Sequence, residues 1–152
     1  MSKSLIIICT CSVLLPSISY ATLGESVASI QQDNIVLAPM VSQVTTQNTS
    51  SNPNFNTSVI KTKTGTIKEF SAQNKVFAVT WTGRAYPNFQ QIFGSYFNQL
   101  DHNAKQTNND MNNFNLVGND FMMKMTGSVN FISGIAYIPS LLPLNITTSD
   151  LK

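Results

Sequence analysis

The stretch "KVFAVTWTGRAYPNFQQIFGSYF", residues 75–97, passes from a strand pattern through a turn into a helix pattern. Its first seven residues present apolar side chains on both faces, because successive side chains of a strand point to opposite sides. One face carries Phe77, Val79 and Trp81, and the other carries Val76, Ala78 and Thr80. A strand that is apolar on both faces is buried on both faces, so residues 75–81 predict a central strand whose larger side chains meet the main cover.

The second half of the stretch predicts that cover, an amphipathic helix. Pro87 suits the approach to a helix, and Asn88 followed by Gln91 resembles a capping box. At about 100° per residue, the apolar residues that follow fall within one arc. They are Phe89, Ile92, Phe93, Tyr96, Phe97 and Leu100. We therefore expect one sheet-helix core in which Phe89, Phe93 and Phe97 pack against the large face of the strand.

Four further segments favour strands, and short turn pairs separate them. Residues 57–63 and 66–72 form a three-stranded meander with residues 75–81, because the pairs Thr64-Gly65 and Gln73-Asn74 suit two-residue hairpin turns. Residues 121–126 and 129–139 follow an Asn-rich loop at 102–120, and Gly134 marks a bulge or a close backbone contact in the last strand. The predicted fold class is α+β, an antiparallel sheet in the order βββαββ with one amphipathic helix packed on one face.

The first 21 residues have the pattern of a signal peptide. Lys3 precedes an apolar run from Leu5 to Leu15, and the segment ends in Ser19-Tyr20-Ala21, which suits signal peptidase cleavage after Ala21. A transmembrane anchor is the alternative, but it needs about 20 apolar residues, and this run is shorter and meets Pro16. We expect a signal peptide at 1–21, an N-terminal segment and polar linker at 22–56, and a single α+β domain at 57–152, located in the periplasm or secreted.

Composition and charge exclude several kinds of chemistry and of partner for the mature chain. Both cysteines, Cys9 and Cys11, lie in the signal segment, so thiol catalysis, disulfides and cysteine-bound zinc are excluded from the remainder. Without Lys3, eight basic residues face seven acidic ones. This near balance predicts no nucleic-acid partner, and no membrane span is expected after signal cleavage. No motif in the sequence points to a cofactor.

Two patterns that suggest a metal or catalytic site are incomplete. His102 is the only histidine and follows Asp101, but no nucleophile or further metal ligand accompanies it, so we expect a solvated side chain near a helix end. In residues 108–119, Asn108, Asp110 and Asn112 alternate as in a calcium loop. The sixth and twelfth positions hold Asn where Gly and Glu are required. We therefore predict no metal and no catalytic residue.

The loop "TGRAY", residues 82–86, is left over once the core is assigned. Exposed Arg and Tyr are enriched at binding hot spots, so Arg84 and Tyr86 are the candidate binding residues. The sequence predicts a non-enzymatic binding or assembly module whose partner is another envelope or secreted protein, engaged by this loop or by an exposed sheet edge. The alternative is a small-ligand binder or hydrolase whose site forms only in three dimensions, for instance from Arg84, Tyr86 and His102.

A longer pattern extends from Gly65 to Pro143. It contains Gly65-Thr66, Glu69-Phe70, the run Val76 to Val79 with Trp81 and Gly83, then Pro87, Gly94, Tyr96 and Phe97, and later Gly134, Ala136, Tyr137, Pro139, Leu141, Leu142 and Pro143. It resembles a family of secreted proteobacterial proteins catalogued as a domain of unknown function. Arg84 and Phe70 depart from the Pro and Tyr that are usual in that family. The resemblance implies secretion and one compact domain, and it brings no known catalytic residue.

Overall fold

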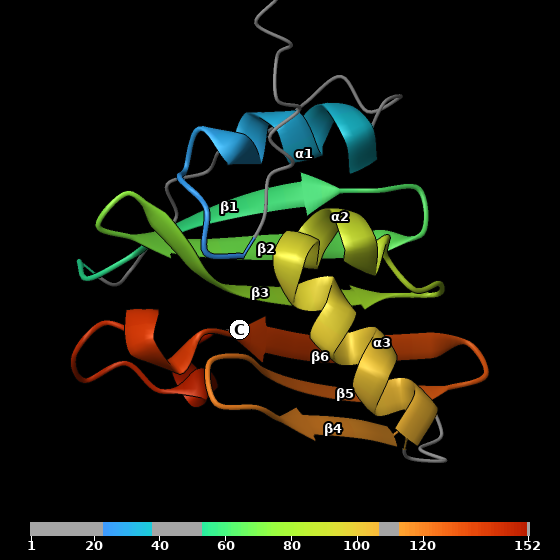
Figure 1. Cartoon of the computed structure of the whole chain (residues 1–152). Helices are drawn as coiled ribbons and strands as arrows, with labels where there is room; N and C mark the ends of the chain where they lie inside the picture. The colour runs from blue at the N-terminus through green and yellow to red at the C-terminus, as the bar shows by residue number, and fades with distance from the viewer. Residues whose placement is uncertain (1–22, 38–52, 107–112, 152) are drawn as a thin grey trace, which may run out of the picture.

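The computed structural model describes residues 23–37, 53–106 and 113–151. The expected signal peptide, most of the polar linker and the three alternating calcium-ligand candidates lie outside the described residues. Six strands form one antiparallel sheet in the order β1-β2-β3-β6-β5-β4 (Figure 1). They are β1 (Asn56–Lys61), β2 (Gly65–Ala72), β3 (Lys75–Gly83), β4 (Asn113–Val117), β5 (Met122–Ser128) and β6 (Phe131–Tyr137).

The predicted α+β class is confirmed, but the sheet has one strand more than expected. β4 lies within the stretch that was predicted as a loop, and it pairs with β5 from Asn113↔Thr126 to Val117↔Met122. Its side chains alternate regularly, with Phe114 and Leu116 buried between exposed neighbours. Asn is a poor strand former, so composition concealed a short strand that is held by its two buried apolar side chains. The order of elements is therefore βββαβββ after the first helix.

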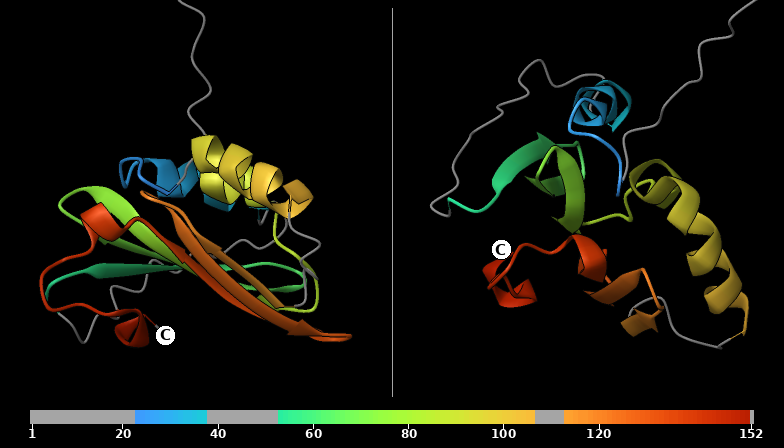
Figure 2. Two further views of the ribbon diagram at one scale, coloured as in Figure 1. Left: turned by 60° about the horizontal axis from the view of Figure 1, so that its bottom comes forward. Right: turned by 60° about the vertical axis from the view of Figure 1, so that its left-hand side comes forward.

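Three helical segments follow β3 and cover one face of the sheet, as Figure 2 shows. They are α2 (Phe89–Phe93), the 3-10 turn η1 (Gly94–Tyr96) and α3 (Phe97–Gln106). The expected cap is confirmed, because Asn88 Oδ1 accepts a hydrogen bond from Gln91 N at 3.2 Å. The single helix that the periodicity predicts is interrupted at Gly94, whose φ of +48° favours glycine. The apolar arc nevertheless packs on the sheet, with Phe93 fully buried.

The segment before the polar linker also belongs to this layer. α1 (Ser29–Leu37) lies on the same face as α2 (Figures 1 and 2). The chain ahead of it pairs with the start of β3, since Gly24 N donates to Val76 O at 2.7 Å and Val76 N donates to Glu25 O at 3.0 Å. Leu23 and Ile30 are buried in the core beneath the helices. Residues 23–37 therefore complete the cover over the β1 side of the sheet.

The expected division of β3 between two faces is wrong at Phe77. Phe70 of β2 pairs with Ala78, whereas the next residue, Ser71, pairs with Val76, so Phe77 is an extra residue in β3. Such a bulge shifts the alternation of side chains by one position. Val76 therefore joins Val79 and Trp81 in the core beneath the helices, and Phe77 joins Ala78 on the opposite face. Simple alternation could not reveal this change of face.

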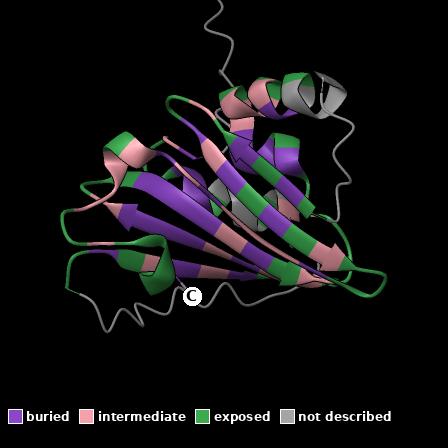
Figure 3. Ribbon diagram, turned by 90° about the horizontal axis from the view of Figure 1, so that it is seen from below, coloured by how far each residue is buried: buried purple, intermediate pink, exposed green. Residues whose placement is uncertain are grey.

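The face that Phe77 joins has a smaller core, covered by the C-terminal tail. Its buried members are Phe55, Phe70, Phe77, Ala78 and Leu151. The tail contains two 3-10 turns, η2 (Pro139–Leu141) and η3 (Thr148–Asp150), and lies on the side of the sheet opposite the helices (Figure 2). Away from the tail, the strands alternate between buried and exposed residues (Figure 3). The tail thus covers one end of this face and leaves the other end open.

Candidate functional site

The uncovered end of this sheet face, called the open face here, carries a row of hydroxyl groups across four neighbouring strands. Thr66 of β2 pairs with Thr82 of β3, Thr82 pairs with Ser133 of β6, and Ser133 pairs with Thr126 of β5. We call these four residues the hydroxyl row. Neighbouring strands lie about 4.8 Å apart, so the row extends over about 14 Å of backbone. Each hydroxyl can both donate and accept a hydrogen bond.

A second row lies two residues further along the same strands. It consists of Lys68, Thr80, Ile135 and Lys124, in that order from β2 to β5. We call it the lysine row, because a lysine stands at each end. At about 3.3 Å per residue, the two rows are separated by about 7 Å. The open face therefore presents a grid of side chains, all polar except Ile135, with a lysine at both corners of one side.

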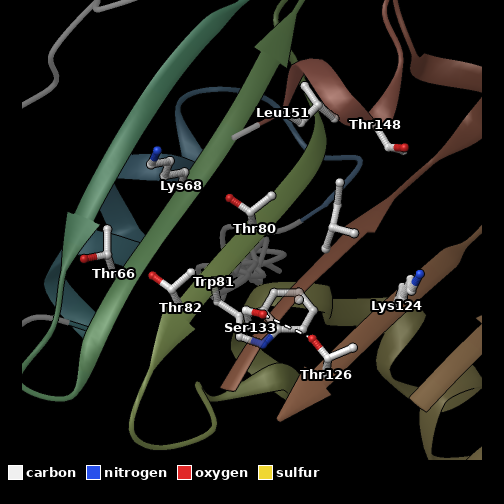
Figure 4. Close-up of a pocket in the computed structure, with 12 residues that line it drawn as sticks. Thr66, Lys68, Thr80, Trp81, Thr82, Lys124, Thr126, Ser133, Thr148 and Leu151 are labelled. Carbon is white, nitrogen blue, oxygen red and sulfur yellow. Dashed lines mark hydrogen bonds between the residues drawn. The ribbon is translucent and has the colours of Figure 1, made fainter. Parts of the chain in front are cut away.

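These two rows line a hollow with a volume of about 430 Å³. Figure 4 shows Lys68 and Lys124 on opposite sides of it, and Thr148 and Leu151 of the tail at one end. The 12 lining residues include no carboxylate, histidine or cysteine. Within the grid, Thr126 Oγ1 and Ser133 Oγ share a hydrogen bond of 3.3 Å. The hollow is therefore flanked by two lysines and by hydroxyl groups, has an apolar wall from residues such as Trp81 and Leu151, and holds no acid-base pair.

The predicted binding residue Arg84 lies at the end of the open face away from the tail. Arg84 N donates a 2.8 Å hydrogen bond to Thr64 O, which continues the β2–β3 pairing past Gly83. Gly83 pairs with Ile132, so Arg84 and Phe131 are the next residues along the two strands, beyond the hydroxyl row. Both are exposed, and both line a second hollow that shares Thr82 with the first. The structure thus places Arg84 beside the hydroxyl row.

The other predicted binding residue, Tyr86, faces a different hollow. Its ring is 44% exposed and lies against Phe89, with ring centroids 6.2 Å apart. With Leu37 and Pro87 it lines a third hollow, which shares Thr66 and Thr82 with the first. Arg84 and Tyr86 are therefore not brought together around one hollow. A binding role for either residue stays a prediction.

The residues considered for catalysis or metal binding are dispersed. His102 is an exposed residue of α3 and lines none of the three hollows described above. Glu69 is buried in β2, whereas Asp120 is exposed and accepts a 3.2 Å hydrogen bond from Gln99 Nε2. Among the described residues, no group of three or more His, Cys, Asp or Glu side chains could hold a metal ion. Arg84, Tyr86 and His102 do not converge on one site.

Neither the hydroxyl row nor the lysine row is predicted from the sequence. Their signal is present in β2, β3 and β5, which alternate core residues with polar residues, as in "TIK" at 66–68 and "KMT" at 124–126, but not in β6, where Ser133 is followed by Gly134 and Ile135. Recognising the grid requires the strand order and register, and β3 pairs with β6, a strand almost fifty positions later. Such a long-range pairing is not encoded by local alternation.

Comparison with known proteins gives a family and no described activity. A family model described as "Protein of unknown function (DUF2844)" matches residues 19–151. No curated protein and no solved structure matches the chain. None of the described helices combines the length and apolarity that crossing a membrane requires. The match includes every described strand and helix, together with the hydroxyl and lysine rows, so the chain belongs to the DUF2844 family of proteins of unknown function.

Proposed function

We propose that the protein is an exported, non-enzymatic binding module that holds an anionic component of the periplasm or cell envelope on its open face. The observation that carries this proposal is the lining of the hollow. Two lysines and a row of hydroxyls face solvent there, with no carboxylate among the lining residues to neutralise the lysines. Lysine presents a point charge with three donors, which suits an anionic ligand. Arg84 adds a third cation at the opposite end.

Hydrolytic catalysis has less support. A hydrolase needs a nucleophile or activated water, together with a group that accepts its proton. The hollow offers hydroxyls, but the only titratable side chains in its lining are Lys68 and Lys124. These lysines stand at opposite ends of one row, about 14 Å apart at the backbone. They are placed to bracket a ligand and do not form an acid-base pair.

The export part of the proposal has its own test. Signal peptidase cleavage after Ala21 is expected because the signal pattern ends in Ser19-Tyr20-Ala21, with small residues at its first and third positions. We expect the protein recovered from the periplasm or the medium to begin at Thr22, as measured by intact mass. Recovery of a chain that still begins at Met1, or of a chain carrying lipid on Cys9 or Cys11, would contradict signal peptide cleavage at this site.

The binding part is tested by charge reversal with a matched control. The double variant Lys68→Glu/Lys124→Glu reverses both charges in the lysine row. Lys63→Glu/Lys75→Glu makes the same change in net charge at exposed lysines outside the lining. Purified proteins are titrated with envelopes isolated from the producing cells, at low and at high salt, after circular dichroism has shown that each variant is folded.

We expect wild type and the control to bind envelopes at low salt and to lose affinity as salt rises, because salt screens exposed charges. The reversal in the lysine row should remove binding. Binding weakened to the same extent in both double variants would show that net charge, not the open face, governs the interaction. Binding by the lysine-row reversal as strong as that of wild type would overturn the proposed function.

A further inference from the structure

We infer that the ligand of the open face is an acidic polysaccharide chain that lies across the strands, with its sugar rings over the hydroxyl row and its carboxylates near the flanking cations. This inference rests on the proposed function, because it names the chemical class of the anionic partner. Three features carry it: the arrangement of the cations, the regularity of the hydroxyls, and an exposed aromatic ring beside them.

The cations stand on both long sides of the hydroxyl row. Lys68 and Lys124 lie about 7 Å to one side, in the lysine row, and Arg84 lies beyond the other side. An extended chain lying over the hydroxyls would thus have a cation within side-chain reach on either flank. Polymers with one carboxylate on each sugar ring present negative charge along both edges of the chain. Arg84 can bind a carboxylate through two parallel hydrogen bonds, which a lysine cannot do.

The hydroxyl row distinguishes a sugar polymer from other anions. Its four side chains recur at every strand, at about 4.8 Å intervals, and each can act as donor and as acceptor. Sugar hydroxyls have the same dual character and repeat along a chain. A phosphate or sulfate ion would occupy only one part of such a row. An acidic peptide offers carboxylates but lacks the regular hydroxyls that the row would match.

Phe131 supplies an apolar surface at the same end as Arg84. It is 54% exposed, although it is a large aromatic residue, and it lines the hollow that adjoins the hydroxyl row. The face of an aromatic ring carries partial negative charge, so it attracts the C–H groups on the flat side of a sugar ring. Because Phe131 is largely exposed, its ring contributes little to the core. It is well placed to orient a sugar ring beside Arg84.

A membrane surface fits the site less well. Lipid recognition by charge uses clusters of about four to eight basic residues on an accessible surface. Here Lys68 and Lys124 line one hollow and Arg84 lines the adjoining one, so the cations are spread across the sheet and do not form one cluster. Anionic vesicles therefore serve as a contrasting arm of the test.

The test measures binding of oligogalacturonate, a carboxylated sugar chain, by isothermal titration calorimetry. A neutral glucan of equal length, poly-glutamate and vesicles containing anionic phospholipid are titrated in parallel. We expect oligogalacturonate to bind about tenfold or more tightly than each of the others, and its affinity to fall about tenfold when salt is raised. Tighter binding of poly-glutamate or of vesicles would overturn the inference.

Two variants separate sugar recognition from charge. Phe131→Ala should weaken oligogalacturonate binding about fivefold at every salt concentration, because it removes an uncharged contact. Val129→Ala changes an apolar residue in the turn just before Phe131, 98% exposed and outside the three hollows, and should have no effect. Equal affinities for Phe131→Ala and wild type would remove the ring from the site and contradict the inference.

The two proposals can fail separately. If envelopes bind and the lysine-row reversal abolishes that binding, but oligogalacturonate does not compete, the open face binds an anion of another class. The proposed function then stands, and the sugar assignment fails. If the lysine-row reversal binds envelopes as wild type does, the open face is not the binding surface, and both proposals fail.

Discussion

Replacing Gly134 with alanine tests whether the close packing of β3 against β6 holds the sheet together. Gly134 pairs directly with Trp81, and the indole lies over the glycine on the helix side of the sheet. A Cβ built at Gly134 would lie 2.6 Å from Trp81 Cε2, closer still to Cζ2, and 2.9 Å from the carbonyl oxygen of Lys124. One neighbour is therefore a ring that must move, and the other is backbone that cannot rotate away.

The expected cost follows from these contacts. The indole is held on its other side by Phe89 and Phe93, with ring centroids 5.2 and 5.8 Å away, so it cannot shift freely. Forcing extra carbon into a packed core costs about 1–3 kcal/mol. The lower entropy of alanine in the unfolded chain offsets less than about 1 kcal/mol of this cost. We therefore expect Gly134→Ala to lower the free energy of unfolding by about 2 kcal/mol.

Urea denaturation followed by circular dichroism measures this change. For a domain of this size, a loss of about 2 kcal/mol lowers the midpoint by about 1 M urea. Ser128→Ala, at an exposed position at the end of β5, is the control and should change little. Trp81→Phe in the Gly134→Ala background should recover about 1 kcal/mol, because phenylalanine lacks the clashing atoms and the indole Nε1 has no hydrogen-bond partner among the described residues. An unchanged or higher midpoint for Gly134→Ala would refute the reasoning.

Three further outcomes are expected. Phe93→Ala should destabilise the domain by about 3–5 kcal/mol in the same assay, since Phe93 is fully buried at the helix-sheet contact; an unchanged midpoint would show that the helices do not stabilise the sheet. His102→Ala should leave both stability and envelope binding unchanged, because the side chain is exposed and lines none of the three hollows; lost binding would place the site on α3. Burial, then the negative charges of Asp120 and Glu25, raise the pKa of Tyr96 above 10.0, so the folded state resists loss of the phenol proton. This contribution is fully present below the unfolded pKa and is lost as pH rises through the folded value, so stability should fall with alkaline pH in wild type and fall less in Tyr96→Phe.

Elements that depend on local pattern were predictable from the sequence. The turn at Gln73-Asn74, the helix cap at Asn88 and the apolar face around Phe93 each follow from residues a few positions apart. The first hairpin turn falls one residue earlier than predicted, at Lys63-Thr64, because Gly65 already belongs to β2. The close backbone contact expected at Gly134 is also confirmed. These features need no knowledge of the rest of the fold, because turn chemistry, capping and helical periodicity are local properties.

Features that depend on distant partners escaped prediction. The bulge at Phe77 exists because Phe70 and Ser71 pair with Ala78 and Val76, a register that alternation along β3 cannot report. β4 was hidden by its asparagines, which oppose strand formation while Phe114 and Leu116 favour it. The hydroxyl row depends on the order of four strands. The sequence makes Arg84 a binding candidate, but its neighbour Phe131 in the second hollow follows only from the pairing of β3 with β6.

The bulge in β3 also determines how the domain can come apart. Val76 and Val79 belong to the core under the helices, and the two residues between them, Phe77 and Ala78, belong to the core under the tail. These four residues are therefore packed on both faces of the sheet. If either the helices or the C-terminal tail detached, apolar side chains of β3 would become exposed. Separate cooperative units arise where packing is divided between segments. Here both cores share one central strand, so we expect helices, sheet and tail to unfold together in one cooperative transition.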